Sequence, residues 1–265
     1  MPDWLTVVAL GLIEGVTEFL PVSSTGHLLL VENAGWLARQ SDLFNVLIQS
    51  GTGVAVALAF AGRVRELILR RDEPATRSYV LKLALAFVIT GVGGLVAKKL
   101  GFTLPRTVMP VVWATLLGGI AILIVEWWLR GRRLGGEVTW AVAIAVGVAQ
   151  IGAAVLPGLS RSGATIMVAL ALGLTRPVAV EFSFLLGVPT LLAAGAFEAA
   201  HSLRHPGPAE TGWGMIVLGT LVAAVAALIT VTWLLRFVRS HTFVGFGWYR
   251  IALGLVILAG ALRGA

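Results

Sequence analysis

The chain has 265 residues, of which 58% are hydrophobic and only 12% are charged, and its mean hydropathy is +0.93. Because soluble domains carry about 25% charged residues, this composition excludes an ordinary soluble protein and predicts an integral membrane protein. The absence of cysteine excludes disulfides, thiolate catalysis and cysteine-ligated metals. The net charge of +7 comes from short basic clusters between apolar runs, which is typical of cytoplasmic loops, so we predict no nucleic-acid partner.

The first predicted element, residues 4–35, is a hairpin of two helices. The N-terminus lacks the basic segment and the cleavage site of a signal peptide, so we expect this segment to belong to the mature fold. A helix from Trp4 to Leu20 rises only about 24 Å before the break at Pro21, which is too short to cross the hydrocarbon core. Irregular backbone at membrane depth is tolerated only where protein or water surrounds it. We therefore interpret residues 4–35 as a re-entrant hairpin.

Six apolar runs, each near the roughly 20 residues that span a bilayer, predict transmembrane helices. They cover residues 43–62, 78–97, 108–129, 178–200, 213–235 and 248–262. Between the third and fourth runs, residues 138–173 again contain a helical stretch, a proline-centred polar break and a second apolar stretch. The predicted fold is thus an all-α integral membrane protein with six transmembrane helices and two re-entrant helical hairpins.

The two hairpins resemble each other in sequence, which predicts an inverted repeat. At a spacing of 136 residues, four positions of the first hairpin align with four of the second: Gly11, Glu14, Leu20 and Pro21 with Gly147, Gln150, Leu156 and Pro157. Each half then has one hairpin and three crossings, and an odd number of crossings places the second half upside down. We expect a single membrane domain over 1–265, with one repeat at 1–136, the other at 137–265 and a polar site at their interface. Chance similarity between apolar segments is the alternative.

Lysine and arginine divide unevenly between the two sides of this predicted fold. One side carries eleven of them and the other six: Arg63, Arg65, Arg70, Arg71, Arg77, Arg130, Arg132, Arg133, Arg176, Arg236 and Arg239, against Arg39, Lys98, Lys99, Arg106, Arg204 and Arg263. The positive-inside rule makes the richer side cytoplasmic. Both termini are then expected to face outward.

Two carboxylates in the first hairpin, Glu14 and Glu18, lie one helical turn apart in an otherwise apolar segment. Ionisable groups at membrane depth are costly and mark functional sites by default. Because residues at i and i+4 share one helix face, both carboxylates can converge on one cation. Oxygen ligands with open positions suit Mg²⁺ or Ca²⁺, and a substrate phosphate would complete the shell. We expect a divalent-cation site at Glu14 and Glu18.

Hydroxyl-rich turns follow the proline of both hairpins and precede a new helix. The first turn contains Ser23, Ser24, Thr25 and Gly26, and the second contains Ser160, Ser162, Gly163 and Thr165, with Arg161 added. Hydroxyls and free N–H groups at a helix start form an anion site, and the arginine fork matches a phosphate bidentately. The pattern indicates a phosphate or pyrophosphate site.

Several of these residues also have a structural interpretation. The serines are alternatively ordinary N-caps, and Arg161 is alternatively a counter-ion of Glu14 or Glu18. His27 is either a hydrogen-bonding group at a helix start or a base or nucleophile.

Other polar residues are expected to lie outside the site. Three of them are predicted to bond neighbouring helices rather than line the cavity: Asn45, Gln49 and Glu181. Two acids near helix ends are predicted to extend to the membrane interface, and two histidines to be solvated in a loop: Glu126 and Glu198, and His201 and His205.

The two polar signatures carry a family resemblance. EGVTEFLPVSSTGH at residues 14–27 and PGLSRSGAT at 157–165 resemble the signatures of the bacterial undecaprenyl pyrophosphate phosphatases, the bacitracin-resistance protein family. The resemblance continues through FNVLIQ at 44–49 and EFSFLL at 181–186. It implies six spanning helices, two re-entrant hairpins, an inverted repeat and a homodimer. It also implies removal of the terminal phosphate from the polyprenyl pyrophosphate that carries cell-wall precursors, at the outer, periplasmic side of the bacterial plasma membrane.

We therefore expect a membrane phosphatase that converts undecaprenyl pyrophosphate to undecaprenyl phosphate and inorganic phosphate, with bacitracin competing for the same lipid. Arg161 and the helix-start groups would hold the pyrophosphate, while Glu18 would bind the cation with Glu14 or act as a base. The nucleophile stays open between Ser24, His27 and water. The competing hypotheses are a transporter or flippase of polyprenyl phosphate lipids, since broken helices in inverted repeats also build transporters, and a non-catalytic membrane scaffold.

Overall fold

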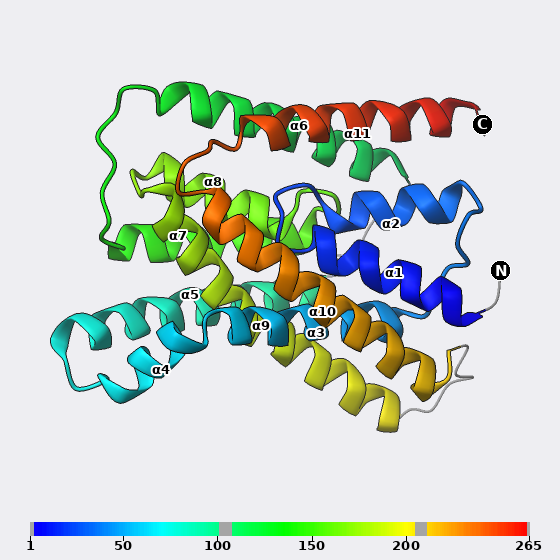
Figure 1. Ribbon diagram of the computed structural model, residues 1–265, viewed down its shortest axis with the longest axis horizontal. Helices are drawn as coiled ribbons and strands as arrows, with labels where there is room; N and C mark the ends of the chain where they lie inside the picture. Colours follow the sequence, from blue (N-terminus) through cyan, green and yellow to red (C-terminus); the bar gives the residue numbers. More distant parts are fainter. Residues whose placement is uncertain (1–2, 101–107, 205–210, 264–265) are drawn as a thin grey trace.

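The structure, a computed structural model, describes residues 3–100, 108–204 and 211–263. These residues form eleven α-helices and no β-strand (Figure 1). The helices are α1 (Asp3–Thr17), α2 (Ser24–Asn33), α3 (Asp42–Ala59), α4 (Ala61–Leu69), α5 (Pro74–Lys99), α6 (Val108–Trp128), α7 (Trp140–Val155), α8 (Arg161–Ala171), α9 (Arg176–Arg204), α10 (Trp213–Phe237) and α11 (Val244–Arg263). The all-α prediction is confirmed.

Six helices in the described part of the chain are long and apolar enough to cross a membrane, which confirms the predicted number. They are α3, α5, α6, α9, α10 and α11, and each overlaps one predicted apolar run. The short helix α4 was not predicted as a separate element, because the apolar run of α3 continues through Phe60 into its first residues. Exposed Leu, Val and Ile side chains cover the outward faces of the long helices, as expected for a surface in contact with hydrocarbon.

The two predicted hairpins are each a pair of helices separated by a proline-containing break, at 18–23 and 156–160. Proline lacks the N–H that would continue the helix. The next helix then starts at a serine N-cap: Ser23 Oγ accepts from the Gly26 N–H at 3.2 Å, and Ser160 Oγ accepts from the Gly163 N–H at 3.1 Å. Both serines have a positive φ, 70° and 66°, which is uncommon outside glycine. The two breaks therefore share an unusual backbone.

Each helix pair returns to the end of the molecule where it began. For the second pair, the chain before α7 and after α8 is joined directly: the Gly135 N–H donates to the Gly173 carbonyl at 2.7 Å, and the Thr175 N–H donates to the Gly135 carbonyl at 2.8 Å. For the first pair, the start of α1 and the end of α2 lie at the same end of the molecule in Figure 1. Both pairs have the out-and-back path of a hairpin.

Each hairpin packs against a long helix from the other half of the chain, α1 against α10 and α7 against α5. Glycines allow this close approach. A Cβ at Gly11 would lie 2.6 Å from the Gly219 carbonyl oxygen, and a Cβ at Gly147 would lie 3.0 Å from that of Ala86. Small residues at helix contacts are the usual device for tight packing in membranes.

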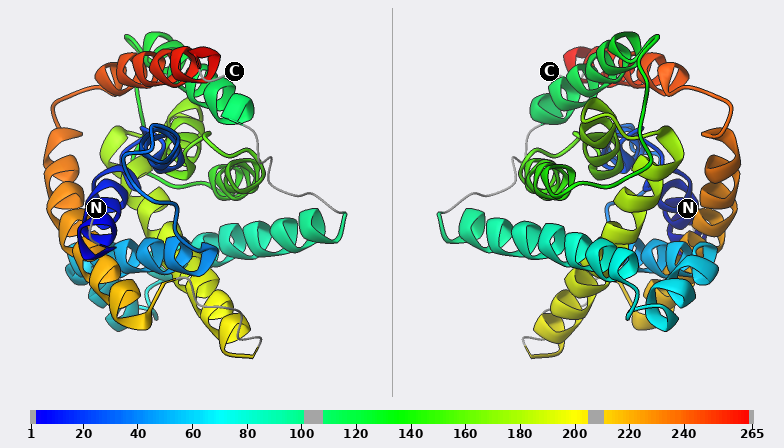
Figure 2. Two further views of the ribbon diagram at one scale, coloured as in Figure 1. Left: turned by 90° about the vertical axis from the view of Figure 1, so that its right-hand side faces the viewer. Right: turned by 90° about the vertical axis from the view of Figure 1, so that its left-hand side faces the viewer.

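The two halves form one body. Helix α3 packs on α9, and α6 packs on α11, so the hairpins lie between the α6–α11 pair and the group of α3, α5 and α9 (Figures 1 and 2). Both termini lie at one end of the molecule in Figure 1, and α4 and the α6–α7 connection lie at the opposite end.

Glu126 corrects one prediction about helix ends. Its side chain does not extend to the membrane interface: it is 2% exposed, forms an ion pair with Arg176 and accepts the Phe243 N–H at 2.8 Å. The pair joins α6, the start of α9 and the residue before α11. The carboxylate is buried because Arg176, far along the chain, and a backbone N–H supply its hydrogen bonds. Glu198, near the end of α9, is half-buried.

Candidate active site

The two breaks meet at Glu18, which follows α1 and is 9% exposed. Its Oε2 accepts a hydrogen bond from the Ser24 hydroxyl at 2.8 Å, and its Oε1 accepts one from Arg161 Nη2 at 3.0 Å. Ser24 is the first residue of α2, and Arg161 is the first residue of α8. One carboxylate therefore brings together the starts of the second helix of each hairpin.

Glu14 lies one turn before Glu18 and is fully buried. Neither of its carboxylate oxygens has a hydrogen-bond partner among the described residues. Glu18, Arg161 and Gln49 lie close enough to act electrostatically on the Glu14 carboxylate. Gln49 of α3 therefore lies beside the acid pair, and whether it bonds the neighbouring helix or lines the site stays open.

The donor chemistry of the acid pair fits a divalent cation. Glu14 offers two buried oxygens without partners, and each Glu18 oxygen retains a second lone pair. No group of three or more His, Asp or Glu side chains in the described ranges is placed to hold a metal ion. The remaining ligands of Mg²⁺ or Ca²⁺ would then have to come from neutral oxygens, water or a substrate phosphate.

Arg161 has donors left for a ligand. Its Nη2 bonds Glu18, whereas its Nε and Nη1 are buried and have no hydrogen-bond partner within the described chain. The guanidinium lies 4.8 Å from the ring centre of Phe19, and a Cβ at Gly187 would lie 3.0 Å from its Cζ. Buried donors without acceptors are costly. The free edge of Arg161 therefore indicates a site for an anion such as a phosphate.

Ser162 links the two hairpins. It is fully buried, and its hydroxyl lies 2.9 Å from the Leu20 carbonyl and 3.2 Å from the Glu18 carbonyl. Ser160 Oγ lies 3.1 Å from Ser162 Oγ, in addition to capping α8. The hydroxyls of Ser160 and Ser162 are thus bonded to the protein. Arg161 and the first N–H groups of α8 are the donors in this turn that remain for a ligand.

The remaining predicted residues of the turns differ in their surroundings. The Thr165 hydroxyl donates to the Arg161 carbonyl at 2.7 Å and pairs with the Ser183 hydroxyl. Thr25 is exposed and Gly26 is buried at the start of α2. Thr165 therefore supports the backbone that carries Arg161. Binding of substrate by Thr25, Gly26, Gly163 and Thr165 stays a prediction.

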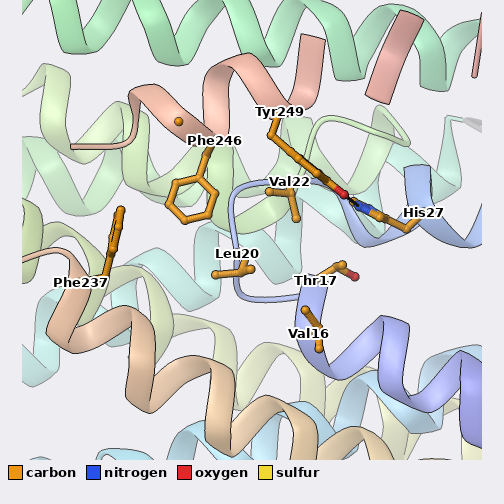
Figure 3. Close-up of a pocket in the computed structure, with 9 residues that line it drawn as sticks. Val16, Thr17, Leu20, Val22, His27, Phe237, Phe246 and Tyr249 are labelled. Atoms are coloured by element: carbon orange, nitrogen blue, oxygen red, sulfur yellow. Dashed lines mark hydrogen bonds between the residues drawn. The ribbon is translucent and has the colours of Figure 1, made fainter. Parts of the chain in front are cut away.

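His27 is held by two hydrogen bonds. Its Nδ1 lies 2.8 Å from the Ser23 carbonyl, and its Nε2 lies 2.6 Å from the Tyr249 hydroxyl (Figure 3). Because a carbonyl only accepts, Nδ1 carries the proton, and in the neutral ring Nε2 accepts from Tyr249. The lone pair of Nε2 is therefore occupied, and His27 acts as a base or nucleophile only if Tyr249 moves.

An apolar groove of about 420 Å³ leads away from His27. Its walls include Val16, Leu20, Val22, Phe237, Phe246 and Tyr249 (Figure 3). A second groove, of about 460 Å³, lies between α1 and α10 and shares Val16 with the first. Together they extend from the first break along the α1–α10 contact, with a lining that suits a hydrocarbon chain.

Two residues of this region were not among the predicted site residues. Tyr249 bonds His27, and Arg250 is fully buried and donates to carbonyls of both breaks. An arginine inside an apolar run was a usable signal. Tyr249 carried none, because tyrosine beside tryptophan is ordinary at a membrane interface.

The polar residues expected outside the site have mixed outcomes. Glu181 accepts hydrogen bonds from Arg63 at 2.9 Å and from Tyr79 at 3.3 Å, which confirms that it bonds neighbouring helices. The Asn45 Oδ1 is buried and has no partner among the described residues. His201 is exposed and stacks on Phe197, and His205 lies outside the described residues.

Comparison with known proteins agrees with the two signatures. The family described as bacitracin resistance protein BacA matches residues 7–256. Relatives named undecaprenyl-diphosphatase include those of Rhizobium johnstonii, 47% identical over 99% of this chain and 98% of the relative, and Xylella fastidiosa, 44% identical over 97% and 98%. The relative of Xanthomonas axonopodis pv. citri is 42% identical over 97% of both chains. With nearly its whole length matched, this chain belongs to the BacA family of bacitracin resistance proteins, which confirms the resemblance drawn from its sequence.

Proposed function

We propose that this protein is a membrane phosphatase that hydrolyses undecaprenyl pyrophosphate to undecaprenyl phosphate and inorganic phosphate. The observation that carries the proposal is the Glu18 carboxylate between Ser24 and Arg161, because it joins a hydroxyl, a base and a phosphate-binding group in one buried site. The relatives named for this activity cover nearly the whole chain. The product is the lipid carrier that cell-wall synthesis uses again, which accounts for a link to bacitracin resistance.

Arg161 and the starts of α2 and α8 bind the pyrophosphate in this proposal. Arg161 supplies two free charged donors, and the first-turn N–H groups of both helices have no acceptor within their helix. Glu14 and the Glu18 oxygen that is not bonded to Ser24 would hold the divalent cation, Mg²⁺ or Ca²⁺, which when bound neutralises phosphate charge and polarises the phosphoryl oxygens.

Ser24 is the nucleophile and Glu18 is its base. The Ser24 Oγ attacks the terminal phosphorus while its proton passes to Glu18 Oε2, which lies 2.8 Å away. The bond from that phosphorus to the bridging oxygen breaks, and undecaprenyl phosphate leaves with the electron pair. Water then attacks the phosphoserine, and the proton returns from Glu18 to Ser24 as inorganic phosphate leaves. His27 holds the Ser23 carbonyl and so steadies the break from which Ser24 projects.

The two apolar grooves take the prenyl chain. The first groove begins at Leu20 and Val22 of the first break, and Val16, the wall that it shares with the second groove, lies two residues before Glu18 in the sequence. A chain placed there stays in an apolar environment while its pyrophosphate reaches the polar site.

We also propose that both hairpins are re-entrant, that the two halves are an inverted repeat and that both termini face the periplasm, where the site opens. Two observations support the repeat. The second helix of each hairpin starts at a serine N-cap with a positive φ, and the first helix of each hairpin packs on a long helix of the other half. The placement of both termini at the end opposite α4 and the α6–α7 connection supports the orientation, since those segments carry many of the arginines.

Purified full-length protein in detergent tests the activity by phosphate release from undecaprenyl pyrophosphate. Ser24→Ala and Glu18→Gln should each lower kcat/KM at least about 100-fold, the usual range for loss of general-base catalysis. Ser240→Ala, a change at an exposed serine, is the matched control and should leave it unchanged. Rapid quench with labelled terminal phosphate should trap phosphoserine; phosphohistidine would name His27, and no labelled protein would name water.

The same preparation tests the alternatives. A wild-type protein that moves an unhydrolysable analogue between leaflets and releases no phosphate would be a transporter, which the names of the relatives do not favour. A protein with neither activity would be a scaffold. The homodimer is checked by cross-linking in membranes, and competition by bacitracin is checked by a raised apparent KM for the lipid.

A further inference from the structure

Arg250, on α11, is fully buried and takes part in none of the ion pairs formed within the described residues. A guanidinium has five N–H donors, and here each faces a backbone carbonyl. Nε donates to Thr115 at 3.2 Å, Nη1 to Leu159 at 3.0 Å and Pro21 at 3.5 Å, and Nη2 to Ala114 and Gly158, both at 3.0 Å. The charge is therefore solvated by the backbone alone.

The carbonyls come from three parts of the fold. Pro21 lies in the break of the first hairpin, Gly158 and Leu159 lie in the break of the second, and Ala114 and Thr115 belong to α6. Carbonyls at helix breaks lack an intrahelical donor and need a partner when buried. One side chain thus fastens both breaks to the same wall of the molecule.

The neighbouring chain leaves room for this side chain. A Cβ at Gly118 would lie 2.6 Å from the Arg250 Cζ, and a Cβ at Gly163 would lie 3.1 Å from its Nη1. The positive charge of Arg250 also lies close enough to His27, at the start of α2, to act on its ring electrostatically. A buried cation without a counter-ion is among the most costly groups in a membrane protein, so its presence points to a function beyond packing.

We propose that Arg250 is a positioning residue of the pyrophosphate site. It fixes the separation of the two breaks so that Ser24 and Arg161 both reach Glu18, and its unpaired positive charge favours an anion between the starts of α2 and α8. The second part of this inference rests on the proposed function, whereas the first part concerns the protein alone.

Spin-label distances test the positioning role without any activity measurement. The chain has no cysteine, so Asn33→Cys on α2 and Val148→Cys on α7, both at exposed positions, give one labelled pair across the hairpins. The full-length protein in detergent should show one narrow distance distribution, and Arg250→Met should broaden or shift it. Arg176→Met, which removes the half-buried arginine that pairs with Glu126 near the end of α6, should lower the unfolding temperature and leave the distribution unchanged.

Kinetics separate the charge from the geometry. Arg250→Met should lower kcat about 100-fold, as expected for misplaced reacting groups, and raise KM. Arg250→Lys keeps the charge but lacks the planar fork, so its KM should stay near the wild-type value while kcat stays low.

Wild-type distances in Arg250→Met would overturn the positioning role, and equal KM values in the Met and Lys variants would overturn the role of the charge. Should Arg250→Met fail to fold, Gly118→Ala displaces the guanidinium in an otherwise intact chain, and the same distance measurement decides. A wild-type protein without phosphatase activity would refute the proposed function while leaving the distance result standing.

Discussion

Replacing Arg161 by lysine measures how much of the site depends on the arginine fork. Arg161 gives one donor to Glu18 and leaves Nε and Nη1 free. Lysine keeps a positive charge but, once bonded to Glu18, has no rigid pair of donors for a phosphate. Each lost charge-assisted hydrogen bond is worth about 1.5–3 kcal/mol, so two of them cost about 3–6 kcal/mol. At about 1.4 kcal/mol per tenfold change, kcat/KM should fall by roughly 10²–10⁴.

The assay is phosphate release from undecaprenyl pyrophosphate by Arg161→Lys in detergent, with Arg133→Lys as the matched control. Arg133 is exposed in the α6–α7 connection, so its change should leave kcat/KM unaltered. Thermal unfolding of both variants separates a loss of activity from a loss of fold. An Arg161→Lys protein that is folded and keeps more than about a tenth of the wild-type kcat/KM would show that the free donors do not bind the substrate in the transition state.

Three further predictions concern the cation and the packing. Removing divalent cations with excess chelator should abolish phosphate release and lower the unfolding temperature, because it leaves the buried Glu14 carboxylate without a ligand, whereas full activity in chelator would exclude a metal at the Glu14–Glu18 site. Glu126→Gln should destabilise the protein by about 1.5–3 kcal/mol in thermal or denaturant unfolding, because it weakens the charge-assisted hydrogen bonds between the buried Glu126 carboxylate and the half-buried Arg176. Gly15→Val should lower the unfolding temperature, because a Cβ at Gly15 would lie 2.7 Å from the Cβ of Ala226 on α10. The control is Gly91→Val, at an open position of α5, which should leave the unfolding temperature unchanged. Equal effects of the two substitutions would refute the tight α1–α10 contact.

The sequence predicted the spanning helices well because their signal is local. A run of about 20 apolar residues is sufficient to cross the bilayer, and no distant partner is needed to recognise it. The central residues of the candidate site could be singled out for a related reason: Glu14, Glu18 and Arg161 are ionisable groups in apolar surroundings, where each carries a high cost. The presence of an ionisable residue in an apolar segment therefore indicates where a site lies.

What the sequence did not predict depends on partners far along the chain. Arg250 bonds backbone carbonyls, and a carbonyl has no signature in the sequence. Glu126 was assigned to the interface because its partner Arg176 lies fifty residues away in another helix. Likewise, nothing local shows that the Ser162 hydroxyl turns toward Leu20 rather than toward a ligand, because that depends on how α8 is rotated against the first hairpin.

The proposed repeat raises the question of why only the first hairpin has an acid pair. Gln150 occupies the position of the second hairpin that corresponds to Glu14, and its amide nitrogen donates to the hydroxyls of Thr90 at 3.2 Å and Thr190 at 3.0 Å. Within the described residues, the same place thus holds a neutral amide bonded through its nitrogen but not its oxygen in one half, and a carboxylate with neither oxygen bonded in the other. Because an unsatisfied buried carboxylate destabilises the fold, its retention in one copy only is best explained by a ligand there. In the proposed site the second copy supplies Arg161 instead, so neither hairpin alone would hold the pyrophosphate, and both would have to be held in register for it to bind.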